Sequence, residues 1–271
     1  LGPNDNAEER LMNLAGAQVL LTVGSNADRS DARDIQIAAL GSEQQLRYRD
    51  WIRRNREYVD QKSGGRIGYF HLPDMGGQGM LEFIKGFYPQ HKKDALLIDV
   101  RYNGGGFVSQ MMIERLARKT WAFMRPRRGL QDSYPARVHD GPKVVLINQH
   151  SGSDGDIFPE SFKIRGLGPL IGMRTWGGVV GIRGDKRFVD GGTSTQPEFA
   201  WWEPKRGWAL ENRGVEPDIE LDFLPEDYVA GRDPQIERGL AELEKSLKEN
   251  PPKKPAAPPT PDKTRVPAAK P

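Results

Sequence analysis

The sequence feature that most constrains the fold is a regular alternation of short apolar runs and helix-like segments, which begins at Arg66. The apolar runs are almost continuous, as in strands that are buried on both faces of a parallel sheet because helices cover them. The pattern therefore predicts an α/β fold with βαβ units around a mostly parallel central sheet. The runs are RIGYFHL, ALLIDV, KVVLINQ and PLIGMRT, and the helix-like segments between them are MLEFIKGFY, FVSQMMIERLARKTW and SGSDGDIFPESFKI.

The segments on either side of this core have different patterns. Two apolar runs, AQVLLTV and RDIQIAAL, flank a polar turn and predict two strands of a small sheet. A capping box at residues 42–45 starts a connecting helix. Residues 187–224 indicate antiparallel strands and turns, and Asp233-Pro234 begins a last helix to about Leu247. The tail contains eight prolines in residues 251–271 and one large aliphatic residue, so we expect it to be disordered.

Composition excludes several classes of protein. The chain has no cysteine and four histidines, so it has no disulfide frame, no thiolate nucleophile and no cysteine-based zinc site, and we expect no metal or cofactor. The formal net charge of +3 comes from the basic tail, which leaves the rest close to neutral and gives no nucleic-acid footprint. We expect neither a membrane span nor an export signal in these residues. The lack of cysteine suits the cytoplasm and the periplasm equally.

The first turn of chemical interest follows the run ALLIDV and reads Asp99-Val100-Arg101-Tyr102-Asn103-Gly104-Gly105-Gly106. Ligands bind at the carboxyl ends of strands in open α/β sheets. Three glycines let the backbone turn sharply and present N–H groups to a ligand. A phosphate-binding loop and a plain tight turn are the alternatives, although the sequence lacks both GK[ST] and GxGxxG.

The second turn follows KVVLINQ and contains Ser153. A serine on a sharp turn between a buried strand and a helix exposes its hydroxyl near the helix N-terminus, as in a nucleophile elbow, although the G-x-S-x-G spelling is absent. The alternative is a serine that only caps the helix. Neighbouring parallel strands would bring the Gly106 N–H and the Ser153 Oγ to one edge of the sheet, so the two turns together favour an oxyanion donor beside a nucleophile.

Five motifs resemble the C-terminal protease region of the tricorn protease family over roughly residues 10–248. They are GRIGYFHLPDM, LLIDVRYNGGG, SGSDGDIFPESF, GLGPLIGMRTWGG and ENRGVEPDIEL. The resemblance implies a ClpP/crotonase-like spiral. It also implies that residues 1–42 are the second half of a PDZ domain, 43–64 a connecting helix, 65–248 an S41-type catalytic core and 249–271 a disordered tail.

The resemblance assigns four site residues. Ser153 would be the nucleophile, and the backbone N–H groups of Gly106 and Asp154 would be the oxyanion donors. Glu211 would act through a second serine that orients the catalytic histidine. In the family that serine and the histidine both precede the PDZ domain, so they lie outside this sequence. From the residues alone, Glu211 is equally suited to pair with Arg213.

The residues near Ser153 offer no obvious replacement for the base. His150 is expected to be a surface turn residue and His71 a structural one, whereas His91 and His139 lie in polar sequence that is expected to be solvated. In the related tail-specific proteases a lysine follows the serine by about twenty-five residues, and Gly178 stands there in this chain. A Ser-Lys dyad is therefore not expected. Lys163 and Lys186 belong to other motifs.

The resemblance predicts a serine endopeptidase of the tricorn type, which cleaves unfolded peptides by acyl transfer and assembles as a homo-oligomer, a hexamer in the family. We expect the protein to contact neither nucleic acid nor a membrane. One alternative is a non-catalytic PDZ-like module that binds peptides by β-augmentation. A nucleotide-binding protein that uses Gly104 to Gly106 is a third. The acidic residue that sets the family's specificity falls in WAFMRPRRGLQDSYP, where its position is not assigned.

Overall fold

The structure is a computed structural model that describes residues 6–182, 187–252 and 255–259, in two compact units, Leu1–Arg54 and Asn55–Pro271. The first unit contains helix α1 (Ala7–Arg10) and the antiparallel pair of β1 (Gln18–Val23) and β2 (Arg33–Ala38). The carboxylate of Asp31 closes the turn by accepting from the N–H groups of Ser25 and Asn26 at 2.8 and 3.0 Å. Two strands joined by a polar turn are what the sequence predicts here.

Helix α2 (Gln44–Lys62) follows, and the Ser42 Oγ accepts from the N–H of Gln44 at its start. The predicted boundaries at residues 42, 64 and 248 and the PDZ assignment stay predictions. Most of the predicted disordered tail, including 260–271, lies outside the described residues.

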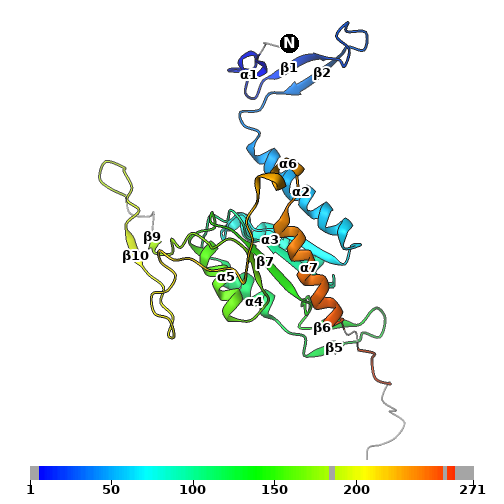
Figure 1. Cartoon of the computed structure of the whole chain (residues 1–271), viewed down its shortest axis with the longest axis vertical. Coiled ribbons are helices and arrows are strands. Elements are labelled where there is room, and N and C mark those ends of the chain that lie inside the picture. The colour runs from blue at the N-terminus through cyan, green and yellow to red at the C-terminus, as the bar shows by residue number, and fades with distance from the viewer. Residues whose placement is uncertain (1–5, 183–186, 253–254, 260–271) are drawn as a thin grey trace, which may run out of the picture. The chain divides into compact units, whose positions relative to one another are not determined.

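Five parallel strands form the central sheet of the second unit (Figure 1). Their spatial order is the reverse of their chain order, so consecutive strands of this sheet are neighbours. The predicted parallel α/β fold is confirmed. One expectation was wrong: the segment at Ile219 is not part of an antiparallel region but pairs in parallel with the strand at Ile171. The strands are β11 (Ile219–Glu220), β8 (Leu170–Gly172), β7 (Lys143–Ile147), β4 (Ala95–Asp99) and β3 (Ile67–His71).

Helices cover both faces of this sheet. Side chains of α3 (Gly77–Gln90), α4 (Ser109–Ala117) and α5 (Asp154–Ile164) form one apolar core with alternate residues of the strands. Helix α7 (Pro234–Glu249) packs on the other face, where a Cβ at Gly239 would lie 2.6 Å from the Leu97 side chain. Figure 1 shows α7 (orange) beside β7, and α7 also contacts β4 and β8. Burial on both faces explains why the strands read as continuous apolar runs.

Several short elements lie outside the central sheet. The helical interpretation of 107–121 was too long, because α4 ends at Ala117 and a hairpin follows. In that hairpin the Trp121 ring meets the edge of Tyr134 at 5.2 Å. No helix in the described residues is long and apolar enough to cross a membrane. The additional elements are the hairpin strands β5 (Ala122–Met124) and β6 (Asp132–Tyr134), the antiparallel pair β9 (Gly181–Ile182) and β10 (Pro197–Phe199), and helix α6 (Pro225–Ala230).

Candidate active site

Ser153 occupies a strained backbone conformation at the start of α5, with φ 58° and ψ −122°. A positive φ is unfavourable for a residue with a Cβ and persists only where the surroundings enforce it. The Ser153 N–H donates to the carbonyl of Gly178 at 3.0 Å, which fixes this turn against the segment after β8. The hydroxyl does not cap the helix, and it has no hydrogen-bond partner in the described part of the chain. The hydroxyl is therefore available for another role.

The glycine-rich turn after β4 closes directly on Ser153. Gly105 has φ 83°, and a Cβ there would lie 2.6 Å from the Cβ of Ser153. Gly106 has φ 151°, and its Cβ would lie 2.0 Å from the carbonyl oxygen of Met75. These two positions accept only glycine, both for backbone conformation and for space. The close approach of the backbone to Ser153 explains the run of glycines.

Two backbone donors beside the serine are unpaired. Neither the Gly106 N–H nor the Asp154 N–H has a hydrogen-bond acceptor among the residues that the structure describes. The first N–H groups of a helix have no acceptor within that helix, and Gly106 is only partly buried, so both donors are available to a ligand. Asp154 is also the first residue of α5, where the helix dipole favours negative charge. The neighbouring donors are all satisfied: Gly104 by Pro73 O at 3.0 Å, Gly105 by Asn103 Oδ1 at 2.9 Å and Phe107 by Met75 O at 2.8 Å.

Side chains fasten the two turns together. The Asp154 carboxylate accepts from the Ser109 N–H at 3.0 Å and from the Ser109 hydroxyl, and burial raises the pKa of Asp154. The buried Asn103 donates to the Leu72 carbonyl at 2.8 Å, while its own backbone oxygen accepts from the Gly152 N–H at 3.0 Å. Sequence reasoning missed Asn103 and Ser109 as positioning residues. An Asn before a glycine run and a Ser at a helix start are the signals that mark such local hydrogen bonds.

Glu211 lies beside the same group of turns. Its Oε2 accepts from the N–H groups of Val179 and Val180, both at 2.8 Å, directly after Gly178. The alternative partner, Arg213, forms no ion pair with it in the described chain, and the Glu211 Oε1 has no recorded partner there. Glu211 thus holds the segment that contacts Ser153 and keeps one oxygen free.

None of the chain's four histidines, all within the described residues, bonds to the Ser153 hydroxyl. His71 is buried with its Nε2 2.8 Å from the Arg101 carbonyl, and burial lowers its pKa. His150 is exposed and stacks on the Tyr102 ring at 5.3 Å. Both match their expected positions.

The expectation of solvated loops at the other two histidines was wrong. His139 is only 2% exposed, because it lies against the end of α3, where its Nδ1 is 3.1 Å from the His91 carbonyl. Burial, followed by the nearby Lys143 charge, lowers the pKa of His139 to about 4. His91 is half-buried, and its Nδ1 lies 2.6 Å from the Tyr88 carbonyl.

No lysine stands at the position of a Ser-Lys dyad. A Cβ at Gly178 would lie 2.5 Å from the ring of Trp176, so a lysine there would displace that ring. Lys163 instead donates to the Glu216 carbonyl at 2.9 Å and pairs with Asp218 at 3.2 Å. Lys186 lies outside the described residues.

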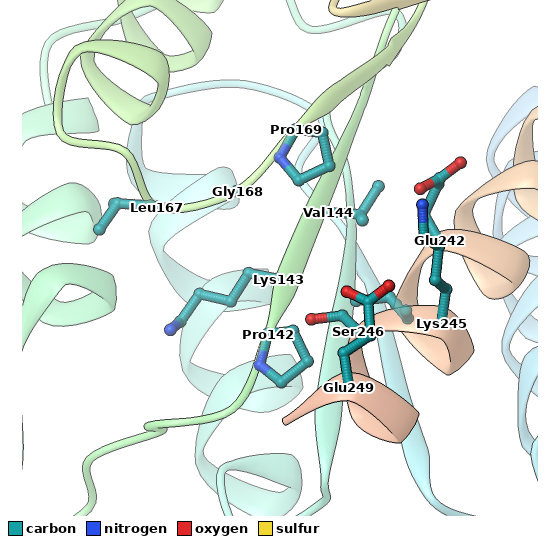
Figure 2. Close-up of a pocket in the computed structure, with 11 residues that line it drawn as sticks. Pro142, Lys143, Val144, Leu167, Gly168, Pro169, Glu242, Lys245, Ser246 and Glu249 are labelled. Carbon is teal, nitrogen blue, oxygen red and sulfur yellow. The ribbon is translucent and has the colours of Figure 1, made fainter. Parts of the chain in front are cut away.

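A pocket of about 380 Å³ lies at the opposite end of the strands (Figure 2). It is lined by Lys143, the first residue of β7, by the 167–169 segment and by α7 residues that include Glu242 and Glu249. β7 ends at Ile147 and Ser153 lies in the turn beyond that end, so this pocket is separate from the candidate active site. Ligands of open α/β sheets bind at the carboxyl ends of strands, which is the end with Ser153.

Comparisons with known proteins identify the family of this chain. The model of peptidase family S41 matches residues 66–221. The chain is 44% identical to the tricorn protease of Thermoplasma acidophilum over 248 residues, which are 92% of this chain and 23% of that protein. It is 42% identical to tricorn protease homolog 1 of Streptomyces coelicolor over 245 residues, 90% of this chain and 23% of that protein.

A solved structure gives the same result. The crystal structure of the tricorn protease matches with a TM-score of 0.84 and 44% identity, over 91% of this chain and 24% of that one. This chain therefore spans about a quarter of the length of the curated relatives it matches. The family match contains the central sheet, both turns beside Ser153 and Glu211, so the chain belongs to peptidase family S41 and is similar to the tricorn proteases.

Proposed function

We propose that this chain carries the catalytic centre of a tricorn-type serine endopeptidase, which hydrolyses unfolded peptides by acyl transfer through Ser153. The observation that carries this proposal is the unpaired Ser153 hydroxyl on a strained turn, beside two unpaired backbone N–H groups. Exposed nucleophiles on strained strand-to-helix turns are the usual arrangement for acyl transfer. A structural cap would use the hydroxyl within the helix, and this one does not.

In the proposed reaction the Ser153 Oγ attacks the peptide carbonyl carbon while a base takes the hydroxyl proton. The carbonyl oxygen becomes an oxyanion that accepts from the Gly106 and Asp154 N–H groups, and the N-terminus of α5 adds favourable potential. Collapse of this intermediate expels the amine, which takes the proton from the base, and leaves an acyl ester on Ser153. Water then releases the acid by the same steps in reverse.

The base in this proposal is a histidine outside this sequence. The four histidines present are engaged elsewhere or exposed, and none bonds to the Ser153 hydroxyl. Glu211 would position that histidine through an intervening serine, whose hydroxyl would donate to the Glu211 Oε1. The hydrogen bonding of the Glu211 carboxylate supports this role, because Oε2 accepts from two backbone N–H groups and Oε1 has no partner in the described chain.

The proposal includes the parts of the protein beyond the catalytic centre. Residues 1–42 would be half of a PDZ domain, 43–64 a connecting helix, 65–248 the catalytic core and 249–271 a disordered tail. Peptides are the substrates, and the protein assembles as a homo-oligomer, which we propose to be a hexamer. Size measurement of the full-length protein by analytical ultracentrifugation tests the assembly.

A fluorophosphonate probe, which reacts only with an activated serine, tests the catalytic proposal. We expect the full-length protein to be labelled at Ser153, Ser153→Ala to be unlabelled, and Ser161→Ala, on the same helix, to be labelled normally. Residues 1–271 alone should label slowly, because a serine hydroxyl is a weak nucleophile without a positioned base. Absence of labelling in the full-length protein would favour the non-catalytic peptide-binding alternative.

A further inference from the structure

Three exposed or half-buried aromatic residues lie next to the proposed oxyanion site. Phe107 directly follows Gly106 and is 63% exposed. Its ring centroid lies 5.9 Å from that of Phe199, which lies 6.3 Å from that of Trp201, itself 45% exposed. We call Phe107, Phe199 and Trp201 the aromatic wall. Such rings are costly to leave in water, and clusters of them mark binding surfaces.

The aromatic wall is anchored to both sides of the site. The N–H of Phe107 donates to the Met75 carbonyl at 2.8 Å, which fixes its position relative to Gly106. Phe199 on β10 packs on Gly181 of β9, where a Cβ would lie 2.1 Å from the ring. Strand β9 continues from Val180, whose N–H donates to Glu211. The wall is therefore held by the same two segments that carry the oxyanion donor and the Glu211 contact.

We propose that the aromatic wall is a substrate subsite that receives an aromatic or large aliphatic side chain of the peptide, close to the scissile bond. This inference rests on the proposed function of Ser153. An extended peptide advances about 3.3 Å per residue, and adjacent Cα atoms are about 3.8 Å apart. A peptide whose carbonyl meets the Gly106 N–H therefore brings a side chain to Phe107 within about one or two residues of the bond that is cut.

The position of Phe107 next to Gly106 also favours a transient peptide over a permanent partner. An occupant that covered Phe107 at all times would lie over the neighbouring Gly106 N–H, where the substrate carbonyl must enter. A second copy of the chain at this surface would then block the reaction. A peptide that leaves after hydrolysis has no such conflict.

The test measures binding in the full-length Ser153→Ala protein, which cannot turn the peptide over. Labelled peptides that differ only in one residue, Phe or Ser, are compared by fluorescence anisotropy, with that residue moved stepwise along the sequence. At one position we expect the Phe peptide to bind roughly tenfold to a hundredfold more tightly, as burial of a phenyl ring predicts. Adding Phe107→Ala should remove most of this preference, and Phe107→Leu should retain part of it.

Trp202→Ala is the matched control. Trp202 is 62% exposed and adjoins Trp201 in sequence, but it makes no ring contact with the wall in the described residues. It should keep the full preference. A preference for Phe that survives Phe107→Ala in a protein with unchanged thermal stability would overturn the subsite. A Phe107→Ala protein of smaller assembly size with an unchanged preference would also overturn it, and would identify the wall as an interface between copies.

The failure of this inference differs from the failure of the proposed function. Loss of the preference on adding Phe107→Ala to the Ser153→Ala protein, together with normal fluorophosphonate labelling of Ser153 in the unsubstituted protein, supports both. A Phe107-dependent preference in the Ser153→Ala protein, without labelling of Ser153 in the unsubstituted protein, retains the subsite and rejects the proposed chemistry. Normal labelling with no preference at any peptide position retains the chemistry and rejects the subsite.

Discussion

Two groups of polar atoms at the carboxyl ends of neighbouring strands differ in whether their hydrogen bonds are satisfied. In the first, the Arg101 guanidinium bonds both oxygens of Asp99 at 2.9 and 2.6 Å, and the Tyr69 hydroxyl donates to Asp99 at 2.8 Å. In the second, the Ser153 hydroxyl and the N–H groups of Gly106 and Asp154 have no partner among the described residues. The first group is buried, and Ser153 is only partly so.

The difference separates a structural role from a chemical one. Although burial alone would raise the pKa of Asp99, the Arg101 guanidinium holds it below its usual value, so the pair stays charged. Arg101 also bonds Asp233, the cap of α7, at 2.9 Å, so this network joins the sheet to that helix. A network whose hydrogen bonds are all made has no free donor or acceptor for a ligand, whereas unpaired donors beside an unpaired hydroxyl can bind one.

The sharpest test of this comparison is Ser153→Ala in the full-length protein. We expect kcat for peptide hydrolysis to fall by about 10⁴-fold or more, since background catalysis from binding and the oxyanion donors is all that remains. The midpoint of urea unfolding should not change, because the hydroxyl bonds nothing in the described chain. Turnover within tenfold of the unsubstituted protein would remove Ser153 from the chemistry.

Arg101→Met tests the satisfied network, and its main effect should be on the free energy of unfolding and not on kcat. Removal of the guanidinium leaves the Asp99 carboxylate buried without its counter-charge, although the Tyr69 hydroxyl still donates to it, and costs about 3–5 kcal/mol of unfolding free energy. Urea unfolding measures this, and the double variant Arg101→Met with Asp99→Leu should recover part of the loss because no lone charge remains. A loss of less than about 1 kcal/mol in the single variant would mean that water or rearrangement compensates the carboxylate.

The fold was largely predictable from the sequence because strands that are buried on both faces of a sheet require nearly continuous apolar sequence. The strands at Ile67, Ala95, Lys143 and Leu170 appear as continuous apolar runs, and the helices between them repeat apolar residues with helical spacing. Strand β11 has only two residues, Ile219 and Glu220, and a pattern that short cannot distinguish parallel from antiparallel pairing. The hairpin after Ala117 was absorbed into a helix prediction for the same reason, since three-residue strands carry little periodicity.

The site was predictable only in part. Glycines after a buried strand and a serine before a helix indicate two sharp turns, and the parallel sheet brings them together. For Ser153 the local pattern left a helix cap as an alternative, and the two turns considered together favoured a nucleophile, whereas the proposed role of Glu211 rests on the family resemblance alone. The Asn103 and Ser109 contacts depend on atomic geometry that spacing does not encode. The burial of His139 also depends on tertiary packing, because its local sequence is polar.

His139 adds a third case to the comparison, because its Nε2 is buried and has no hydrogen-bond partner in the described chain, and it lies just before the first residue of β7, Lys143. Its pKa of about 4 in the folded protein lies below the usual 6.5. Between these values the unfolded state binds more protons, so stability is complete above pH 6.5 and falls as the pH drops towards 4, by about 3 kcal/mol. His139→Gln should flatten this part of the pH profile in urea unfolding without changing kcat.

The exposed His150→Gln serves as the control for that measurement and should leave the acid dependence as it is. If the free energy of unfolding depends on pH in the same way in His139→Gln and in the unsubstituted protein, folding does not lower the pKa of His139, and the expectation is wrong. A fall in kcat in His139→Gln would show that an enclosed unpaired group also contributes to the chemistry.

Glu211 combines the two kinds of atom compared above. Its Oε2 accepts from two N–H donors, and its Oε1 has no partner in the described chain, so Glu211→Gln tests whether that Oε1 takes part in the chemistry. The amide oxygen of Gln can still accept from Val179 and Val180, so the segment beside Ser153 should keep its position. The amide nitrogen would then face the positioning serine, where a donor replaces an acceptor. We expect kcat to fall on the order of 10²-fold, equivalent to about 2.7 kcal/mol, with little change in KM, by analogy with other groups that orient a base.

Glu211→Ala removes the Oε2 contacts too and should also slow fluorophosphonate labelling and lower the unfolding midpoint. If Glu211→Gln raises KM and leaves kcat unchanged, Glu211 contacts the substrate and does not position the base.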